Sequence, residues 1–170
     1  MNKRLCRFFA GVAVSLVFFG VPSALSAQTA APPVVRFIRF VGLKTFDAGR
    51  LEKIMETQAK RFRWGRGAPL DETVLRHDLE RIEKFYKSQG FYDARILSHR
   101  LIRLGGREVI LEIMLDEGRP VMVDRVELLV DGAESGPWHD DLRAVIPLKQ
   151  GRRFTTPDFD DTDKVVRRFL

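Results

Sequence analysis

Residues 67–86, GAPLDETVLRHDLERIEKFY, recur in pattern at residues 151–170, GRRFTTPDFDDTDKVVRRFL. In both stretches a glycine is followed by five large apolar residues at the same offsets, and the two copies lie 84 positions apart. A recurring unit of this length indicates one supersecondary module used in series. The first copy continues to Gly118, whereas the second stops at Leu170, part-way along a predicted helix. We therefore expect tandem units with the second incomplete, in the N-terminal part of a longer protein.

The N-terminus has the layout of a secretory signal peptide. Lys3, Arg4 and Arg7 precede an apolar stretch at residues 8–19, and small residues follow up to Ala27. This stretch is shorter than the ~20 residues that span a bilayer, so cleavage after Ala27 is favoured over an uncleaved membrane anchor. We expect residues 1–27 to be the signal peptide and residues 28–33 to be a short Ala/Pro linker.

Composition and charge limit the classes of function. The single cysteine, Cys6, lies in the signal peptide, so packing without disulfides must hold the mature core. The formal net charge of +6 falls to +3 in the mature chain, with +4 in residues 28–118 and −1 in residues 119–170. This mild imbalance does not favour a nucleic-acid partner, and export makes one less expected.

Three helix starts share one pattern. Asp47, Asp71 and Thr155 are candidate N-cap residues, and each lies between two apolar residues five positions apart. This is the spacing of a hydrophobic staple, in which the residue before the cap packs on the fourth helical residue. The helix after Asp71 has an apolar stripe and ends at Gly90, which suits the left-handed position beyond a helix end. Its polar side, interpreted as a solvated face rather than as catalytic acids, includes Glu72, Glu80 and Glu83.

Alternating apolar segments predict the strands. Residues 34–41 end at Gly42, and residues 128–130, followed by Gly132, echo them in the second unit. Residues 92–104 and 107–115 flank Gly105-Gly106, a favourable two-residue type I′ turn.

That turn predicts a register in which the numbers of paired residues sum to 211. Arg100 then lies on the core face, while His99 pairs with Glu112 and Arg103 with Glu108 on the other face. The expected fold class is α+β. It consists of tandem strand–helix–helix–strand–strand units, each with a three-stranded mixed sheet and two helices on one face.

Taken in order, these motifs resemble the polypeptide-transport-associated (POTRA) domains of the BamA/TamA outer-membrane protein assembly family. The matching features are the strand 38–43 (IRFVGL), the staple at Leu70-Asp71, the helix exit 87–94 (KSQGFYDA) and the strand end 116–120 (DEGRP). The resemblance covers nearly all of residues 34–170. It implies a first POTRA-like domain at residues 34–118 and a second, truncated one at residues 119–170.

The resemblance also implies a function. Such modules are periplasmic, are associated with the outer membrane, and bind unfolded outer-membrane protein clients or assembly-complex proteins. Attachment to a membrane barrel that is missing from this chain is implied too. In POTRA domains the third strand is central and the second is an exposed edge, where a guest strand can be added. The partner-binding residues implied here are Arg95, Ile96, Leu97, Ser98, His99, Arg100, Leu101 and Arg103.

A second candidate contact surface is a loop in which cations alternate with aromatic residues. It contains Lys60, Arg61, Arg63, Trp64 and Arg66. We interpret it first as a solvated loop between helices, with lipid headgroups or a partner protein as an alternative and nucleic acid as the least favoured ligand.

No motif for catalysis or for a metal ion is found in the sequence. His77, His99 and His139 are isolated, and no pair of them has zinc spacing. We expect a non-enzymatic protein without a cofactor. Two alternatives stay open, namely an envelope or cell-division scaffold of the FtsQ type and the accessory module of a larger envelope protein such as a POTRA-fused lipase. An uncleaved anchor would favour the first and a catalytic domain would favour the second.

Overall fold

The computed structural model describes residues 31–59, 69–129 and 137–169. The predicted signal peptide and the basic loop at residues 60–66 lie outside the described residues, as do residues 28–30 of the linker and residues 130–132. In chain order the elements are β1 (Val34–Val41), α1 (Ala48–Glu52), α2 (Glu72–Ser88), β2 (Arg95–Gly105), β3 (Glu108–Asp116), α3 (Pro137–Val145) and α4 (Thr156–Phe169).

Short-range hydrogen bonds start the helices where the sequence predicts them. The Asp47 carboxylate accepts the Arg50 N–H (2.9 Å), and the Asp71 carboxylate accepts the Thr73 N–H (2.7 Å). At α4 the Thr155 hydroxyl accepts the Asp158 N–H (3.1 Å). The three predicted N-caps are thus confirmed, because each side chain satisfies a donor that the helix itself leaves free.

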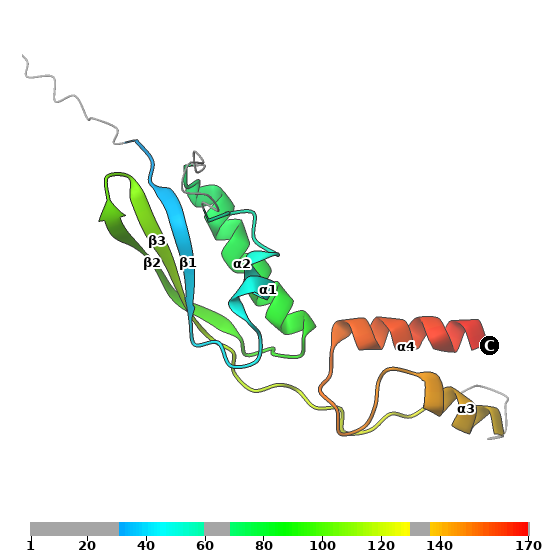
Figure 1. Cartoon of the computed structure of the whole chain (residues 1–170). Coiled ribbons are helices and arrows are strands. Elements are labelled where there is room, and N and C mark those ends of the chain that lie inside the picture. The colour runs from blue at the N-terminus through cyan, green and yellow to red at the C-terminus, as the bar shows by residue number, and fades with distance from the viewer. Residues whose placement is uncertain (1–30, 60–68, 130–136, 170) are drawn as a thin grey trace, which may run out of the picture. The chain divides into compact units, whose positions relative to one another are not determined.

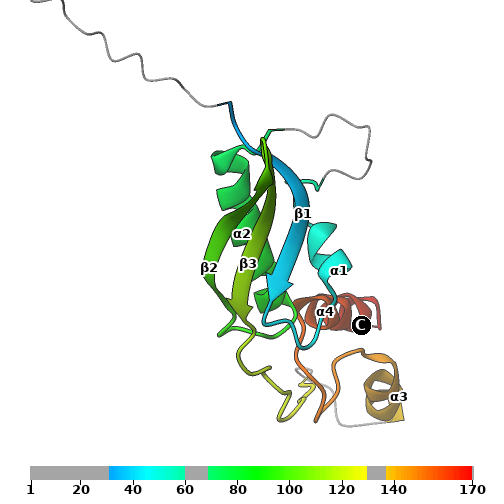
Figure 2. The ribbon, with the colours of Figure 1, turned by 60° about the vertical axis from the view of Figure 1, so that its left-hand side comes forward.

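The strands form one mixed sheet in the order β1-β3-β2. β1 runs parallel to the central strand β3, and β2 runs antiparallel to it. Both α1 and α2 lie on the same side of this sheet (Figure 1), and β3 separates the two outer strands (Figure 2). The predicted α+β class, with two helices on one face of a three-stranded mixed sheet, is confirmed.

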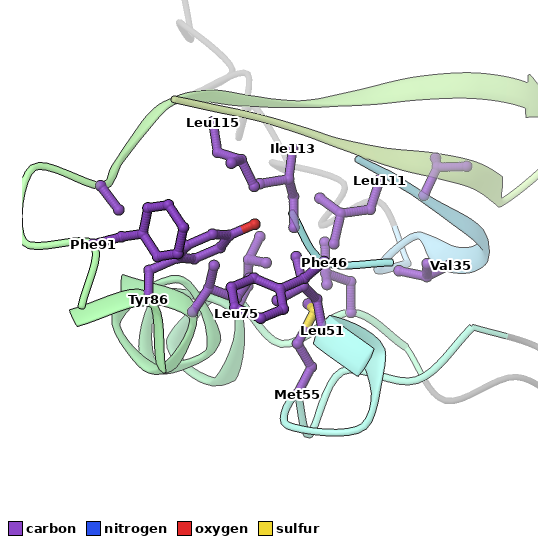
Figure 3. Close-up of a cluster of buried hydrophobic side chains, with 14 residues drawn as sticks. Val35, Phe46, Leu51, Met55, Leu75, Tyr86, Phe91, Leu111, Ile113 and Leu115 are labelled. Atoms are coloured by element: carbon purple, nitrogen blue, oxygen red, sulfur yellow. The ribbon is translucent and has the colours of Figure 1, made fainter. Parts of the chain in front are cut away.

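The core lies between the sheet and the two helices. Leu111 and Ile113 of β3 and Ile82 of α2 are fully buried. Aromatic rings fill the end near Phe91, where the Phe46 ring lies 5.4 Å from the Tyr86 ring and 5.9 Å from the Phe91 ring in edge-to-face contacts (Figure 3). Such contacts combine large apolar burial with a specific geometry, so they fix the end of α2 against the loop that leads into α1.

A buried carboxylate holds the loop between β1 and α1. Glu117, directly after β3, is 1% exposed, and it accepts hydrogen bonds from the Lys44 N–H (2.9 Å) and the Thr45 hydroxyl (2.7 Å). It also accepts the Tyr86 hydroxyl from α2 at 2.9 Å. One side chain thereby connects β3, α2 and the loop that leads into α1.

Contacts of the first unit recur in residues 119–169. Leu70 donates its N–H to the Pro33 carbonyl (2.7 Å), and Phe154, 84 residues later, donates to the Val121 carbonyl (2.9 Å). Asp78 of α2 accepts the Thr57 N–H (2.7 Å). Its counterpart by the same offset, Thr162, accepts the Leu148 N–H at 3.1 Å. Positions 84 residues apart thus form similar hydrogen bonds.

The strand predicted at residues 128–130 is not found in its described part, and this prediction is wrong for Leu128 and Leu129. Near this segment the structure has only an isolated bridge between Met122 and Arg153. In the first unit β1 is hydrogen-bonded along its length to β3. Leu128 and Leu129 pair with no strand in the described part of the chain, so they lack the ladder of hydrogen bonds that makes β1 a strand.

The start of the second unit contacts the end of α2. Val121 donates its N–H to the Gly90 carbonyl (2.8 Å), and the guanidinium of Arg153 lies over the Phe46 and Phe91 rings at 5.4 and 5.2 Å. Gly90 has φ +85°, and a β-carbon there would lie 2.0 Å from the Phe154 carbonyl oxygen. Glycine is therefore required both by the helix end and by this contact.

None of the helices in the described ranges is long and apolar enough to cross a membrane.

Candidate protein-docking edge

The eight residues that the family resemblance implies for partner binding all lie on β2. This strand is at an outer position of the sheet, and β3 is its hydrogen-bonded neighbour. Apart from Ile96, the side chains of these residues are exposed. We call this side of the sheet the β2 edge, defined by residues 95–103.

The pairing of β2 with β3 differs from the predicted register. Residue numbers sum to 211 at Arg95–Asp116, but Ser98 pairs with Met114 and Gly105 with Glu108. Two register shifts, at Leu97 and at Leu104, separate these regions. The turn is Gly106-Arg107 rather than Gly105-Gly106. Each irregularity adds one residue to β2, as a β-bulge does.

These shifts exchange the faces of β2 between residues 98 and 103. Arg100 pairs with Glu112 on the face away from the helices, whereas His99, Leu101 and Arg103 pair with core-facing residues of β3. The predicted pairs His99–Glu112 and Arg103–Glu108 are therefore wrong. Instead, Arg100 Nη2 lies 2.6 Å from Glu112 Oε1, and Arg39 Nη1 on β1 lies 3.4 Å from Glu112 Oε2.

A hydrogen bond from β2 to α2 shows which backbone groups of β2 point outward, that is, away from β3. Ile96 donates its N–H to Glu83 Oε1 at 3.1 Å, so this donor points away from β3. Glu83 was predicted to lie on the solvated face of α2, but its carboxylate contacts the β2 edge. Because the Ile96 N–H is already bonded to Glu83, it is not free to bond to an added strand.

The Ile96–Leu115 pair is consequently not hydrogen-bonded between the strands. Hydrogen-bonded and non-hydrogen-bonded pairs alternate in antiparallel sheets. Counting along β3, the residues opposite Ile113, Leu111 and Val109 then also direct their backbone groups outward. These residues are His99, Leu101 and Arg103. The edge thus offers three successive sets of N–H and C=O groups.

The opposite edge of the sheet is partly covered. The start of β1 bridges to Pro69, and Leu70 donates its N–H to the Pro33 carbonyl. The basic loop lies outside the described residues, so its candidate contact residues stay a prediction. His77, His99 and His139 come from α2, β2 and α3, and the described residues contain no group of three or more side chains that could hold a metal ion.

The POTRA family model, described as surface antigen variable number repeat, matches residues 33–118, which is half of the chain. The chain belongs to the POTRA family. The family resemblance inferred from the sequence is therefore confirmed. None of the curated proteins compared with the chain is significantly similar to it.

Two solved structures are similar to this chain. The crystal structure of Haemophilus influenzae BamA POTRA3-5 is 19% identical, with a TM-score of 0.47, and the match covers 81% of this chain and 53% of that one. The N-terminal domain of Omp85 from the thermophilic cyanobacterium Thermosynechococcus elongatus is 13% identical, with a TM-score of 0.40, and the match covers 80% of this chain and 55% of that one. The chain spans about half the length of these structures.

The sequence predicted that β2 lies at an edge of the sheet, but it did not predict the contacts that two side chains, Glu83 and Glu112, make with this strand. Glu83 has the spacing of a solvated residue on α2, and only its position beside Ile96 reveals its contact with β2. Glu112 was assigned to the open face, but with His99 as its partner. The alternation of residues along β3 was enough to predict the face of the sheet on which Glu112 lies. Its partner on β2 could not be predicted, because that pairing depends on the bulges of β2.

Proposed function

We propose that this chain is the periplasmic POTRA region of an outer-membrane protein assembly or translocation factor. In this proposal the β2 edge binds extended segments of unfolded client chains or of partner proteins by strand addition. The role is non-enzymatic, because binding alone is required of the module. The family membership of residues 33–118 and the signal-peptide layout of residues 1–27 support this assignment.

One observation carries the proposal, namely the three outward sets of backbone groups on β2. An edge strand of this kind pairs with a guest mainly through N–H and C=O groups, which every protein segment possesses. It therefore suits clients of many different sequences. The cations Arg95, Arg100 and Arg103 along the same strand discourage uncontrolled edge-to-edge pairing between copies of the protein.

Proline at an outward position tests this proposal. His99→Pro removes one outward donor and obstructs a guest strand, while the ladder between β2 and β3 stays intact. We expect binding of an extended outer-membrane-strand peptide of about ten residues to weaken by about tenfold. His99→Ala, the matched control, should bind like the parent. Peptide titration followed by NMR of residues 28–170 gives both affinities and maps the contact.

Two outcomes would count against strand addition at this edge. In the first, His99→Pro binds the peptide as well as the parent does. In the second, the chemical shifts move at Lys60–Arg66 and not along β2, which would make the basic loop the contact surface.

A further inference from the structure

Paired residues form rows across the open face of the sheet, which is the face away from α1 and α2. One row is Arg39–Glu112–Arg100, from β1 through β3 to β2. The adjacent row is Phe37–Ile110–Ile102. Residues that face each other across neighbouring strands are in side-chain contact distance, so each row ends at β2 beside the position of an added strand.

The charged row carries an excess of positive charge. The Glu112 carboxylate is bonded to both arginines, at 2.6 Å from Arg100 Nη2 and 3.4 Å from Arg39 Nη1. Two guanidinium groups therefore share one carboxylate. Arg100 stands at the free end of the row, and its side chain is 68% exposed although it binds the nearly buried Glu112. A second carboxylate on the other side of Arg100 would complete an alternating row of charges.

The neighbouring row is apolar and also ends at β2. Phe37 is 55% exposed, while Ile110 and Ile102 are half-buried. A guest strand paired with β2 places every second side chain on this face. One of its residues would thus lie beside Arg100, and the residue two positions away would lie beside Ile102.

We propose that the β2 edge selects extended protein segments in which an acidic residue lies two positions from a large apolar residue. The acidic side chain faces Arg100 and the apolar side chain packs beside Ile102. This selectivity rests on the proposed strand addition and deepens it, because the backbone provides binding and the two rows provide preference. The guest is therefore a strand with an acidic residue within its alternating pattern.

Three peptides that differ only at one position test the selectivity. They share the apolar residue and carry Glu, Gln or Lys two positions from it, and each is titrated into residues 28–170 at low salt with NMR detection. We expect the Glu peptide to bind about two- to fivefold more tightly than the Gln peptide, the range of an exposed ion pair, and the Lys peptide to bind most weakly. The preference should decrease with added salt.

Matched variants assign the preference to Arg100. Arg100→Gln should remove the difference between the Glu and Gln peptides. Arg103→Gln removes the same charge from the same strand but on the other face, so the difference should persist. Ile102→Ser, which leaves the charged row untouched, should weaken all three peptides and keep their order.

The results separate the selectivity from strand addition itself. Equal affinities for the Glu and Gln peptides, with shifts along β2, would overturn the selectivity and leave strand addition standing. A preference that survives Arg100→Gln would overturn it as well. If no peptide shifts the β2 resonances, the proposed function fails and the selectivity fails with it.

Discussion

At Glu117 one buried carboxylate receives hydrogen bonds from the loop after β1 and from α2. Burial by itself would raise the pKa of this group, but the hydrogen bonds from Lys44, Thr45 and Tyr86 outweigh it and hold the pKa below the ordinary glutamate value. The ionised form is thus favoured in the folded state. Burial and the bond to Glu117 correspondingly raise the pKa of the Tyr86 hydroxyl, so it remains a donor.

This arrangement predicts how stability depends on pH. Because the folded-state pKa of Glu117 lies below the unfolded value of about 4.3, the carboxylate stabilises the fold above that pH. The contribution is lost as the pH falls through the folded-state pKa. Glu117→Gln should reduce the free energy of unfolding at pH 7 by about 1.5–3 kcal/mol, which is the contribution of one charge-assisted hydrogen bond. It should also weaken the acid dependence.

Urea unfolding at pH 7 and near pH 3.5 measures both effects. Glu80→Gln is the matched control, since Glu80 is an exposed carboxylate on α2 that lies 3.9 Å from the Lys84 ammonium. Part of the acid dependence should remain in Glu117→Gln, because hydrogen bonds also hold the pKa of buried Asp78 down against the opposing effect of burial. An unchanged acid dependence in Glu117→Gln would refute the role assigned to this carboxylate.

The elements differ in how far local sequence determines them. Asp47 and Asp71 cap helices through bonds to residues two or three positions away, so their roles could be read from spacing. The position of β2 in the sheet followed from the family resemblance. Its register did not follow from the sequence. Gly105 and Gly106 both have positive φ, which glycine adopts readily, so the local sequence is compatible with a turn at Gly105-Gly106 or at Gly106-Arg107. The observed pairing of β2 with β3 occurs together with two contacts between residues distant in sequence, namely the hydrogen bond from Ile96 to Glu83 and the ion pair of Arg100 with Glu112.

The alternation of backbone groups along β2 predicts opposite effects of proline at adjacent residues. Ser98 pairs with Met114 and directs its N–H toward β3, so Ser98→Pro removes a ladder bond and should destabilise the fold by about 1–3 kcal/mol. His99→Pro should cost much less, because its N–H points outward. Thermal or urea unfolding of the two variants compares them, and equal losses of stability would contradict the assigned alternation.

At the scale of the whole molecule, we propose that the domain boundary lies at residue 118. Large apolar side chains after it are exposed, including Leu129 at 88%, Met122 at 52% and Phe159 at 52%. By the offset of 84, the counterparts of Met122 and Phe159 are Ile38 and Leu75, which pack in the core of the first unit. Residues 34–118 should therefore resist proteolysis as one cooperative domain, while residues 119–170 are digested first. Equal hydrogen-exchange protection over both segments would argue against this division.

Backbone hydrogen exchange with and without a guest peptide tests strand addition most directly. On peptide binding, exchange should slow at the outward amides His99, Leu101 and Arg103. The inward amides Ser98 and Arg100 should change little, because they already face β3. This alternating pattern is the prediction of backbone pairing at the β2 edge. Unchanged exchange at His99, Leu101 and Arg103 in the peptide-bound protein would contradict it.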